Sequence, residues 1–412
     1  MNTATIPALP TQAPPLVRQH WKILAVCFLV ALIDGFDTLM LAFIAPLIGK
    51  QFQLAPTAVG QLFAAGYLGA VIGALGIGPL SDRFGRKRML LVSLCIIVVF
   101  TFLCSQAASP QSLMGLRLLA GLGLGGAMPT LIALAAESVP ASHRNRAVTW
   151  MFMGYPLGAV VGGSITAAAL QHGWQVIFVG GAIAALSMIP LVAWGLPESL
   201  PGAAVKAGRK GAFASLGAQF ADGRALSALL LWLGVFSIMI ASYFLVSWMP
   251  SVLVHSGFAP KEAAIAGVLL NIGSVTGALL LTFAVKRYGP WLPVVGAFIA
   301  GTLMVLLLGS RIGNPEGLWV LVFITGMCIF GGQLSTPALS AQLFPAPVRG
   351  AGTGWAMGIG RIGSIVGPAL GGVLMSGKPD MTSLFELLAM TVGVAALAIG
   401  LSAFLRPAAG RD

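Results

Sequence analysis

Charged side chains are scarce in this chain of 412 residues, in which Asp, Glu, Lys and Arg together make up only 8%. An ordinary soluble domain is about 25% charged, so this chain has too little polar surface to cover a water-soluble globule. Hydrophobic residues make up 58% of the chain, and the mean hydropathy is +0.95. The composition therefore predicts a membrane protein that crosses the bilayer several times.

Cysteine and histidine are also scarce, with four residues of each. None of them has metal-ligand spacing, so we expect neither a disulfide framework nor a metal site. Two dinucleotide-like fingerprints, Gly121–Gly126 and Gly358–Gly363, lie within apolar runs, and a phosphate-loop-like stretch ends at Pro379 where Ser or Thr is required. With no nucleophile–base pair either, we expect no enzyme activity and no cofactor, and energy from an ion gradient rather than from ATP.

Long apolar runs dominate the chain, and a helix needs about 20 apolar residues to cross the hydrocarbon layer. Short separators rich in Gly, Pro, Asn and charge divide the runs. We count twelve predicted spans, at about 22–48, 57–80, 89–107, 111–136, 147–170, 174–196, 225–250, 263–285, 291–309, 317–343, 350–375 and 382–405.

The positions of the cations predict the orientation of these spans, because Lys and Arg gather in cytoplasmic loops. If the N-terminus is cytoplasmic, 17 of the 23 Lys and Arg residues fall on the inner side. The exceptions are Lys50, Lys261, Arg311 and Lys378 on the outer side and Arg117 and Arg361 within spans. We therefore expect both termini in the cytoplasm, and we attribute the net charge of +12 to membrane topology rather than to a nucleic-acid partner.

The two halves of the chain resemble each other at a nearly constant offset. Gly69, Gly73 and Arg83 recur 204 residues later as Gly273, Gly277 and Arg287. Two six-helix halves in the same orientation are parallel repeats, which typically hold a site between them near the bilayer midplane. The predicted organisation is an N-terminal six-helix bundle over residues 1–198, a cytoplasmic linker over 199–224 and a C-terminal six-helix bundle over 225–412.

The inner loop after the second span, GPLSDRFGRKR (Gly78–Arg88), places one carboxylate among four cations. Such a loop can form an ion-pair latch between helix ends that is closed in one state and broken in another; the alternative is a simple positive-inside anchor. We predict gating roles for Asp82, Arg83 and Arg86, and for Glu137 and Arg144 as an inner-gate pair in the stretch ESVPASHRNR.

The loop string resembles the signature loop of the major facilitator superfamily. Three further strings, DGFD (Asp34–Asp37), GYPLGAVVGG (Gly154–Gly163) and RGAGTGWAMGIGRIGSIVGP (Arg349–Pro368), are similar to the aromatic acid:H+ symporters within it. The resemblance implies an all-α fold of twelve membrane helices and proton-coupled import of small aromatic, hydroxybenzoate-like carboxylates by alternating access. The alternative is a proton-coupled exporter, or an importer of another organic anion, metabolite or drug.

Four charges inside the spans are the candidate mechanism residues, since an ionisable group within a span is costly and usually functional. Asp34 and Asp37 share one helix face. Their depths pair Asp37 with Arg117 and Asp34 with Arg361. We predict that both acids are proton-linked with Arg117 as their modulator, and that the planar fork of Arg361 binds the substrate carboxylate; the alternative is a set of static ion pairs.

Aromatic and polar residues within spans are the candidates for a cavity wall, because an aromatic substrate needs stacking faces and a few polar partners. For each of them, packing between helices is the competing role. The candidates are Phe36, Tyr155, Tyr243, Asn271, Gln333 and Trp355. The expected partners are the aromatic acid, protons and the lipid bilayer, and we expect a monomer in the inner (plasma) membrane.

Overall fold

The computed structural model describes residues 17–140, 143–197, 217, 219–221, 223–312, 316–345, 348–377 and 380–406, which form helices and no strands. Most of the predicted linker 199–224 lies outside these residues, as do both chain termini. The first half holds α1 (Arg18–Gln51), α2 (Pro56–Phe84), α3 (Arg86–Cys104), α4 (Pro110–Glu137), α5 (Arg144–Ala169), the short 3-10 helix η2 (Leu170–His172) and α6 (Trp174–Gly195). The second half holds α8 (Ala225–His255), α9 (Pro260–Tyr288), α10 (Trp291–Arg311), α11 (Leu318–Leu343), α12 (Arg349–Ser376) and α13 (Met381–Leu405).

The prediction of twelve spans is confirmed: twelve helices of the described residues are long and apolar enough to cross a membrane. Even the shortest, α3, has 19 residues and measures about 28 Å at ~1.5 Å per residue, close to the ~30 Å hydrocarbon layer. Large apolar side chains point outward along these helices; Leu75, Phe283 and Phe404 each expose more than 70% of their surface. In a chain of this kind such faces meet lipid.

Proline and glycine mark where helices begin and end. Pro56, Pro110 and Pro260 occupy the first positions of α2, α4 and α9, where a missing N–H costs nothing and the fixed φ suits a helix. Gly85 separates α2 from α3 with a φ of +99°, a conformation that favours glycine. Because of this one-residue turn, the start of α3 lies directly beside the end of α2.

The sequence repeat is visible in the helix packing. In the first half Gly69 of α2 lies against the backbone of Leu118 in α4, so closely that a Cβ would collide with the Leu118 carbonyl. In the second half Gly273 of α9 lies against Phe323 of α11 in the same way. These matching approaches explain why both glycines recur at the same offset: small residues let membrane helices pack backbone to backbone.

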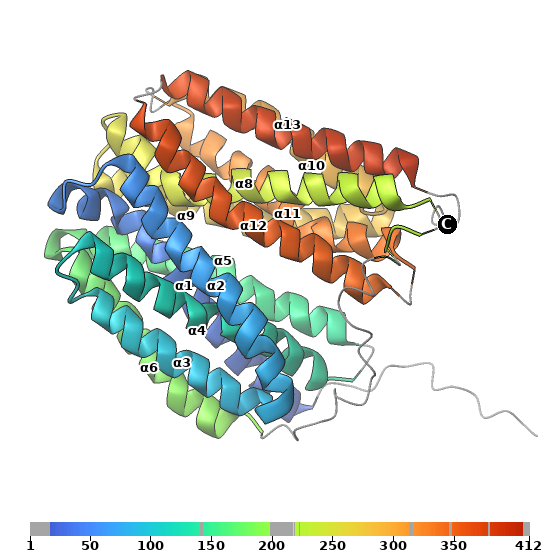
Figure 1. Cartoon of the computed structure of the whole chain (residues 1–412), viewed down its shortest axis with the longest axis horizontal. Helices are drawn as coiled ribbons and strands as arrows, with labels where there is room; N and C mark the ends of the chain where they lie inside the picture. Colours follow the sequence, from blue (N-terminus) through green and yellow to red (C-terminus); the bar gives the residue numbers. More distant parts are fainter. Residues whose placement is uncertain are drawn as a thin grey trace, which may run out of the picture.

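The two six-helix halves lie side by side (Figure 1). We call the end of the molecule at which α1 begins and α13 ends the terminal end. The halves meet through α2 with α12, α5 with α9, and α1 with α8. Towards the opposite end, the Phe63 and Trp248 rings pack edge to face with centroids 5.8 Å apart, and Gly60 lies against the backbone of Pro368 and Gly372.

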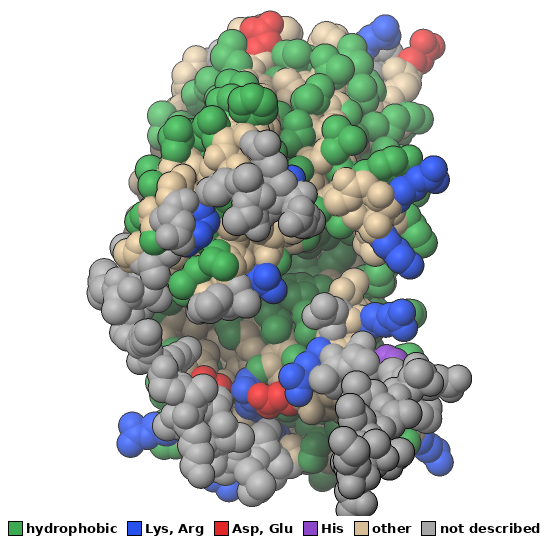
Figure 2. Space-filling view, turned by 90° about the vertical axis from the view of Figure 1, so that its right-hand side faces the viewer, with side chains coloured by type: hydrophobic (Ala, Val, Ile, Leu, Met, Phe, Trp, Pro, Cys, Tyr) green, Lys and Arg blue, Asp and Glu red, His purple; other side chains and the backbone are tan. Residues whose placement is uncertain are grey.

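Figure 2 looks onto the terminal end, where the visible Lys and Arg side chains outnumber Asp and Glu. This excess of cations agrees with the sequence, which assigns most Lys and Arg residues to the side of the chain termini.

Candidate functional site

A buried ion pair lies at the centre of the first half. Arg117 Nη1 of α4 donates a hydrogen bond to Asp37 Oδ1 of α1 at 2.9 Å, and Arg117 Nη2 donates to the Asp37 carbonyl at 3.3 Å. Asp37 is 0% exposed and Arg117 is 2% exposed. The ion pair between Asp37 and Arg117 is the one that their similar depths predict. Each residue supplies the counter-charge that the other needs when it is buried.

A residue of a third helix, α3, also binds the Asp37 carboxylate. Thr101 of α3 donates its hydroxyl hydrogen bond to Asp37 Oδ2 at 2.6 Å and is itself fully buried. Both carboxylate oxygens of Asp37 are therefore occupied, one by a guanidinium and one by a hydroxyl. Thr101 is not among the residues predicted from the sequence; its only sequence signal is that it is a polar residue within an otherwise apolar run.

Removing the Thr101 hydroxyl should destabilise the protein. Thr101→Val keeps the side-chain shape but leaves Asp37 Oδ2 without its donor, at a cost of about 1–3 kcal/mol, so we expect a lower melting temperature of the purified protein. Thr101→Ser should restore most of the loss. Ser93→Ala is the matched control, because Ser93 is buried on the same helix and its hydroxyl has no partner. Equal melting temperatures for the Val and Ser variants would contradict this role.

Asp34 lies one turn before Asp37 on the same helix and has a different environment. It is 4% exposed, and within the described ranges its Oδ1 atom has no hydrogen-bond partner. It interacts electrostatically with Asp37 and Arg361. However, no ion pair joins Asp34 to Arg361, so the direct pairing predicted from depth is wrong for this conformation.

Arg361 lies on α12, facing this region from the second half. Its side chain is half-buried, and within the described part of the chain its guanidinium forms no ion pair and donates no hydrogen bond. The guanidinium thus lies within electrostatic range of an acid and keeps its hydrogen-bond donors unused.

A cavity of about 70 Å³ lies between the two halves. Four of the six predicted wall residues line it: Tyr155 from the first half, and Tyr243, Asn271 and Gln333 from the second. The other lining residues are Leu39, Pro156, Val246, Ser274, Phe330 and Leu334. The cavity therefore combines aromatic faces with a small number of polar groups, as small-molecule sites commonly do.

Three of the chain's four tyrosines converge beside this cavity. Tyr67 of α2 packs edge to face against Tyr243 of α8 with ring centroids 4.9 Å apart, and its hydroxyl lies 3.3 Å from Ser247 Oγ. Tyr155 of α5 interacts electrostatically with Asp34 and is hydrogen-bonded to Thr38. Tyr155 thus links the cavity to Asp34 on α1, and Tyr67 links α2 to α8 of the second half.

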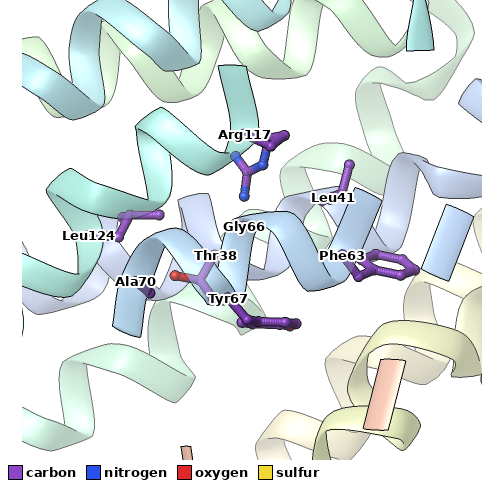
Figure 3. A pocket seen from close by; sticks show the side chains of 8 residues that line it. All are labelled: Thr38, Leu41, Phe63, Gly66, Tyr67, Ala70, Arg117 and Leu124. Atoms are coloured by element: carbon purple, nitrogen blue, oxygen red, sulfur yellow. The ribbon is translucent and has the colours of Figure 1, made fainter. Parts of the chain in front are cut away.

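Figure 3 shows a smaller space of about 20 Å³ between α1, α2 and α4, lined by Thr38, Tyr67 and Arg117 among others. The guanidinium of Arg117 points toward Gly66 of α2. Gly66 lies next to the arginine, and Arg117 is enclosed between the helices that carry Asp37 and Tyr67.

Two predicted wall residues lie elsewhere and do not line the cavity. Phe36 is buried within the first half, where its ring fills the space beside Gly162 of α5 and Gly181 of α6. Trp355 stacks on Trp232 of α8, with ring centroids 6.2 Å apart. Both are aromatic residues with packing partners inside one half, which is the competing role that the sequence left open.

The predicted gating residues lie at the terminal end of the first half. Arg86 contacts Asp82 at 3.4 Å and Glu137 at 2.5 Å, so it joins the ends of α2 and α4. Glu137 thus pairs with Arg86 and not with Arg144, which is exposed; the predicted Glu137–Arg144 pair is wrong here. The one-residue turn at Gly85 brings Arg86, at the start of α3, next to the ends of α2 and α4. Arg83 is also exposed, and its guanidinium lies over the Phe84 ring.

Comparisons with known proteins agree with this architecture. The family model described as "Major Facilitator Superfamily" matches residues 27–345. A 4-hydroxybenzoate transporter of Acinetobacter baylyi is 33% identical, with 93% of this chain and 91% of the relative covered. A gallate transporter of Pseudomonas putida is also 33% identical, over 93% and 92%. A 3-(3-hydroxy-phenyl)propionate transporter of Escherichia coli is 34% identical, over 91% and 92%.

Solved structures of similar fold include a bacterial homologue of the human lysosomal transporter Spinster in an inward-facing, occupied conformation. Its TM-score is 0.75 at 17% identity, over 95% of this chain and 97% of that one. A D-xylose–proton symporter has a TM-score of 0.70 at 17% identity, over 93% and 97%. At such identities the likeness establishes the arrangement of helices alone.

Proposed function

The chain belongs to the Major Facilitator Superfamily, and from that premise we propose that it imports small aromatic carboxylates together with protons. Its fold and relatives are those of membrane transporters and not of enzymes. Three relatives are named as transporters of 4-hydroxybenzoate, gallate and 3-(3-hydroxy-phenyl)propionate. These names support an aromatic acid as the substrate class of this chain.

The observation that carries this proposal is the cavity between the halves. Tyr155, Tyr243 and Phe330 offer aromatic faces for a substrate ring. Tyr155 interacts with Asp34, which in turn interacts with Arg361. Arg361 does not line the cavity in this conformation, and its planar cation, suited to a carboxylate, would reach the substrate when the halves move.

The size of the cavity supports alternating access. A volume of about 70 Å³ is well below the ~300–1,000 Å³ typical of small-molecule sites. A substrate would fit only when the halves move apart. Rocking of two repeats about a site between them is the usual motion of parallel-repeat transporters. The Asp82–Arg86–Glu137 cluster lies within the first half, and we propose that it latches helix ends of that half in one of the two arrangements.

We assign the exchangeable proton to Asp34. The Asp37 carboxylate is already bound by Arg117 and Thr101, whereas Asp34 has a buried oxygen without a partner. A substrate carboxylate that binds Arg361 would weaken the attraction between Arg361 and Asp34, and Asp34 would then take up a proton. Cargo and proton would thus be linked by an exchange of partners, with Asp37 and Arg117 as the fixed pair that adjusts the charge around Asp34.

We propose that the terminal end faces the cytoplasm, because Lys and Arg outnumber Asp and Glu there, and that the chain is a monomer in the inner membrane. An aromatic carboxylate moving inward works against an inside-negative potential at about 2.3 kcal/mol per charge per 100 mV. One co-transported proton cancels that term and adds the pH gradient.

Uptake into proteoliposomes tests the coupling. An inwardly directed proton gradient should drive accumulation of 4-hydroxybenzoate or benzoate, and a protonophore should abolish it. Liposomes without protein control for diffusion of the neutral acid across the bilayer. Protein-dependent uptake that ignores both the gradient and the protonophore would contradict proton coupling.

A further inference from the structure

Gln333 presents an unused acceptor at the cavity. It lies on α11 among the residues that line the space between the halves. Its Oε1 atom is buried and has no hydrogen-bond partner among the residues that the structure describes. A buried amide oxygen without a partner is unfavourable, and such an atom on the wall of a binding cavity is typically satisfied by what the cavity binds.

The orientation of the amide is set from the other side. Gln333 Nε2 lies 3.2 Å from Met239 Sδ of α8. A thioether can accept a hydrogen bond but cannot donate one, so the nitrogen belongs at the sulfur and the oxygen points away from it. The amide oxygen of this cavity-wall residue is therefore an acceptor that another group can fill.

Two neighbouring polar groups of the lining have partners: Asn271 Nδ2 donates to the Gly267 carbonyl at 2.8 Å, and the Tyr155 hydroxyl interacts with Thr38. Gln333 Oε1 differs from the other polar atoms of the lining because it is fully buried and has no hydrogen-bond partner among the described residues.

We infer that Gln333 determines specificity by selecting aromatic acids whose ring carries a hydrogen-bond donor, such as a phenolic hydroxyl, over acids that lack one. The inference rests on the proposed function and narrows its substrate class. A phenolic hydroxyl keeps its proton near neutral pH and can donate to the amide oxygen. An unsubstituted ring would bury the same oxygen without a partner, and sites built to bind a hydroxyl discriminate strongly against analogues without it.

Binding to the purified protein, measured by calorimetry, tests this with 3- and 4-hydroxybenzoate, their methoxy analogues and benzoate. Each methoxy analogue keeps the ring oxygen but has no proton to donate. In the parent, at least one hydroxy acid should bind about tenfold or more tightly than its methoxy analogue. In Gln333→Met, which replaces the amide with an apolar chain of similar length, that ratio should fall to about one through loss of hydroxy-acid affinity, with benzoate affinity retained.

Ser335→Ala is the matched control, because Ser335 lies on the same helix and its hydroxyl is bonded to the Gly331 carbonyl; its ratio should equal that of the parent. If the methionine variant is too unstable to purify, the ratio of methoxy-acid to hydroxy-acid dissociation constants of the parent is the test. Equal binding of hydroxy and methoxy acids by the parent, or an unchanged ratio in Gln333→Met, would overturn the inference while the proposed function stands. No binding of any of these acids would overturn the proposed function and this inference with it.

Discussion

Replacing Asp34 with asparagine should abolish accumulation of an aromatic acid driven by a proton gradient, while binding of the acid stays within a few-fold of the parent. Asparagine has nearly the shape of a protonated carboxyl group but cannot exchange a proton. For one proton per substrate, a gradient of one pH unit at zero membrane potential should give the parent about tenfold accumulation, because one pH unit is worth 1.36 kcal/mol. The variant should reach a ratio of about one.

Asp37→Asn is the informative comparison for this result. It removes the counter-charge of Arg117, which is 2% exposed, and breaking a buried pair by removing one partner costs about 3–5 kcal/mol. We therefore expect Asp37→Asn to lower the melting temperature, whereas Asp34→Asn, whose parent carboxylate has no ion-pair partner, leaves it nearly unchanged. Undiminished gradient-driven accumulation in Asp34→Asn would contradict the assignment of the exchangeable proton to Asp34.

Replacing Arg361 should weaken substrate binding even where the charge is kept. Arg361→Lys retains a cation but loses the planar fork that holds a carboxylate through two parallel hydrogen bonds. Hydrogen bonds to charged groups contribute about 1.5–3 kcal/mol, so we expect the dissociation constant for 4-hydroxybenzoate to rise about tenfold or more. Arg361→Ala, which also removes the charge, should weaken binding further. Calorimetry or tryptophan fluorescence of the purified protein measures both.

Arg349→Lys is the control on the same helix. Arg349 lies at the terminal end of α12, where its Nε donates to the Phe344 carbonyl at 3.3 Å, far along the helix from Arg361. Its replacement should leave the dissociation constant unchanged. If Arg361→Ala bound the acid as tightly as the parent does, the substrate anchor would have to be sought at Arg117.

The sequence by itself determined the membrane class, the twelve spans and the repeat. These features are local or periodic: the length of an apolar run is compared with the thickness of the bilayer, and a glycine recurs where two helices pack closely. The sequence also predicted that Asp37 and Arg117 lie at the same depth in the bilayer, because a straight helix rises ~1.5 Å per residue.

Only the tertiary structure decided which groups touch. Depth does not specify how far each helix is rotated or which neighbour it meets, so Asp34 and Arg361 share a depth without forming an ion pair. Thr101 reaches Asp37 from α3 although nothing in its own run marks it as a partner. Tyr155 and Gln333, from different halves, line one cavity. Phe36 and Trp355 instead pack against residues of the half to which each belongs. The physical reason is that contacts between helices depend on rotation, crossing and close backbone approach, which are properties of pairs of segments far apart in the chain.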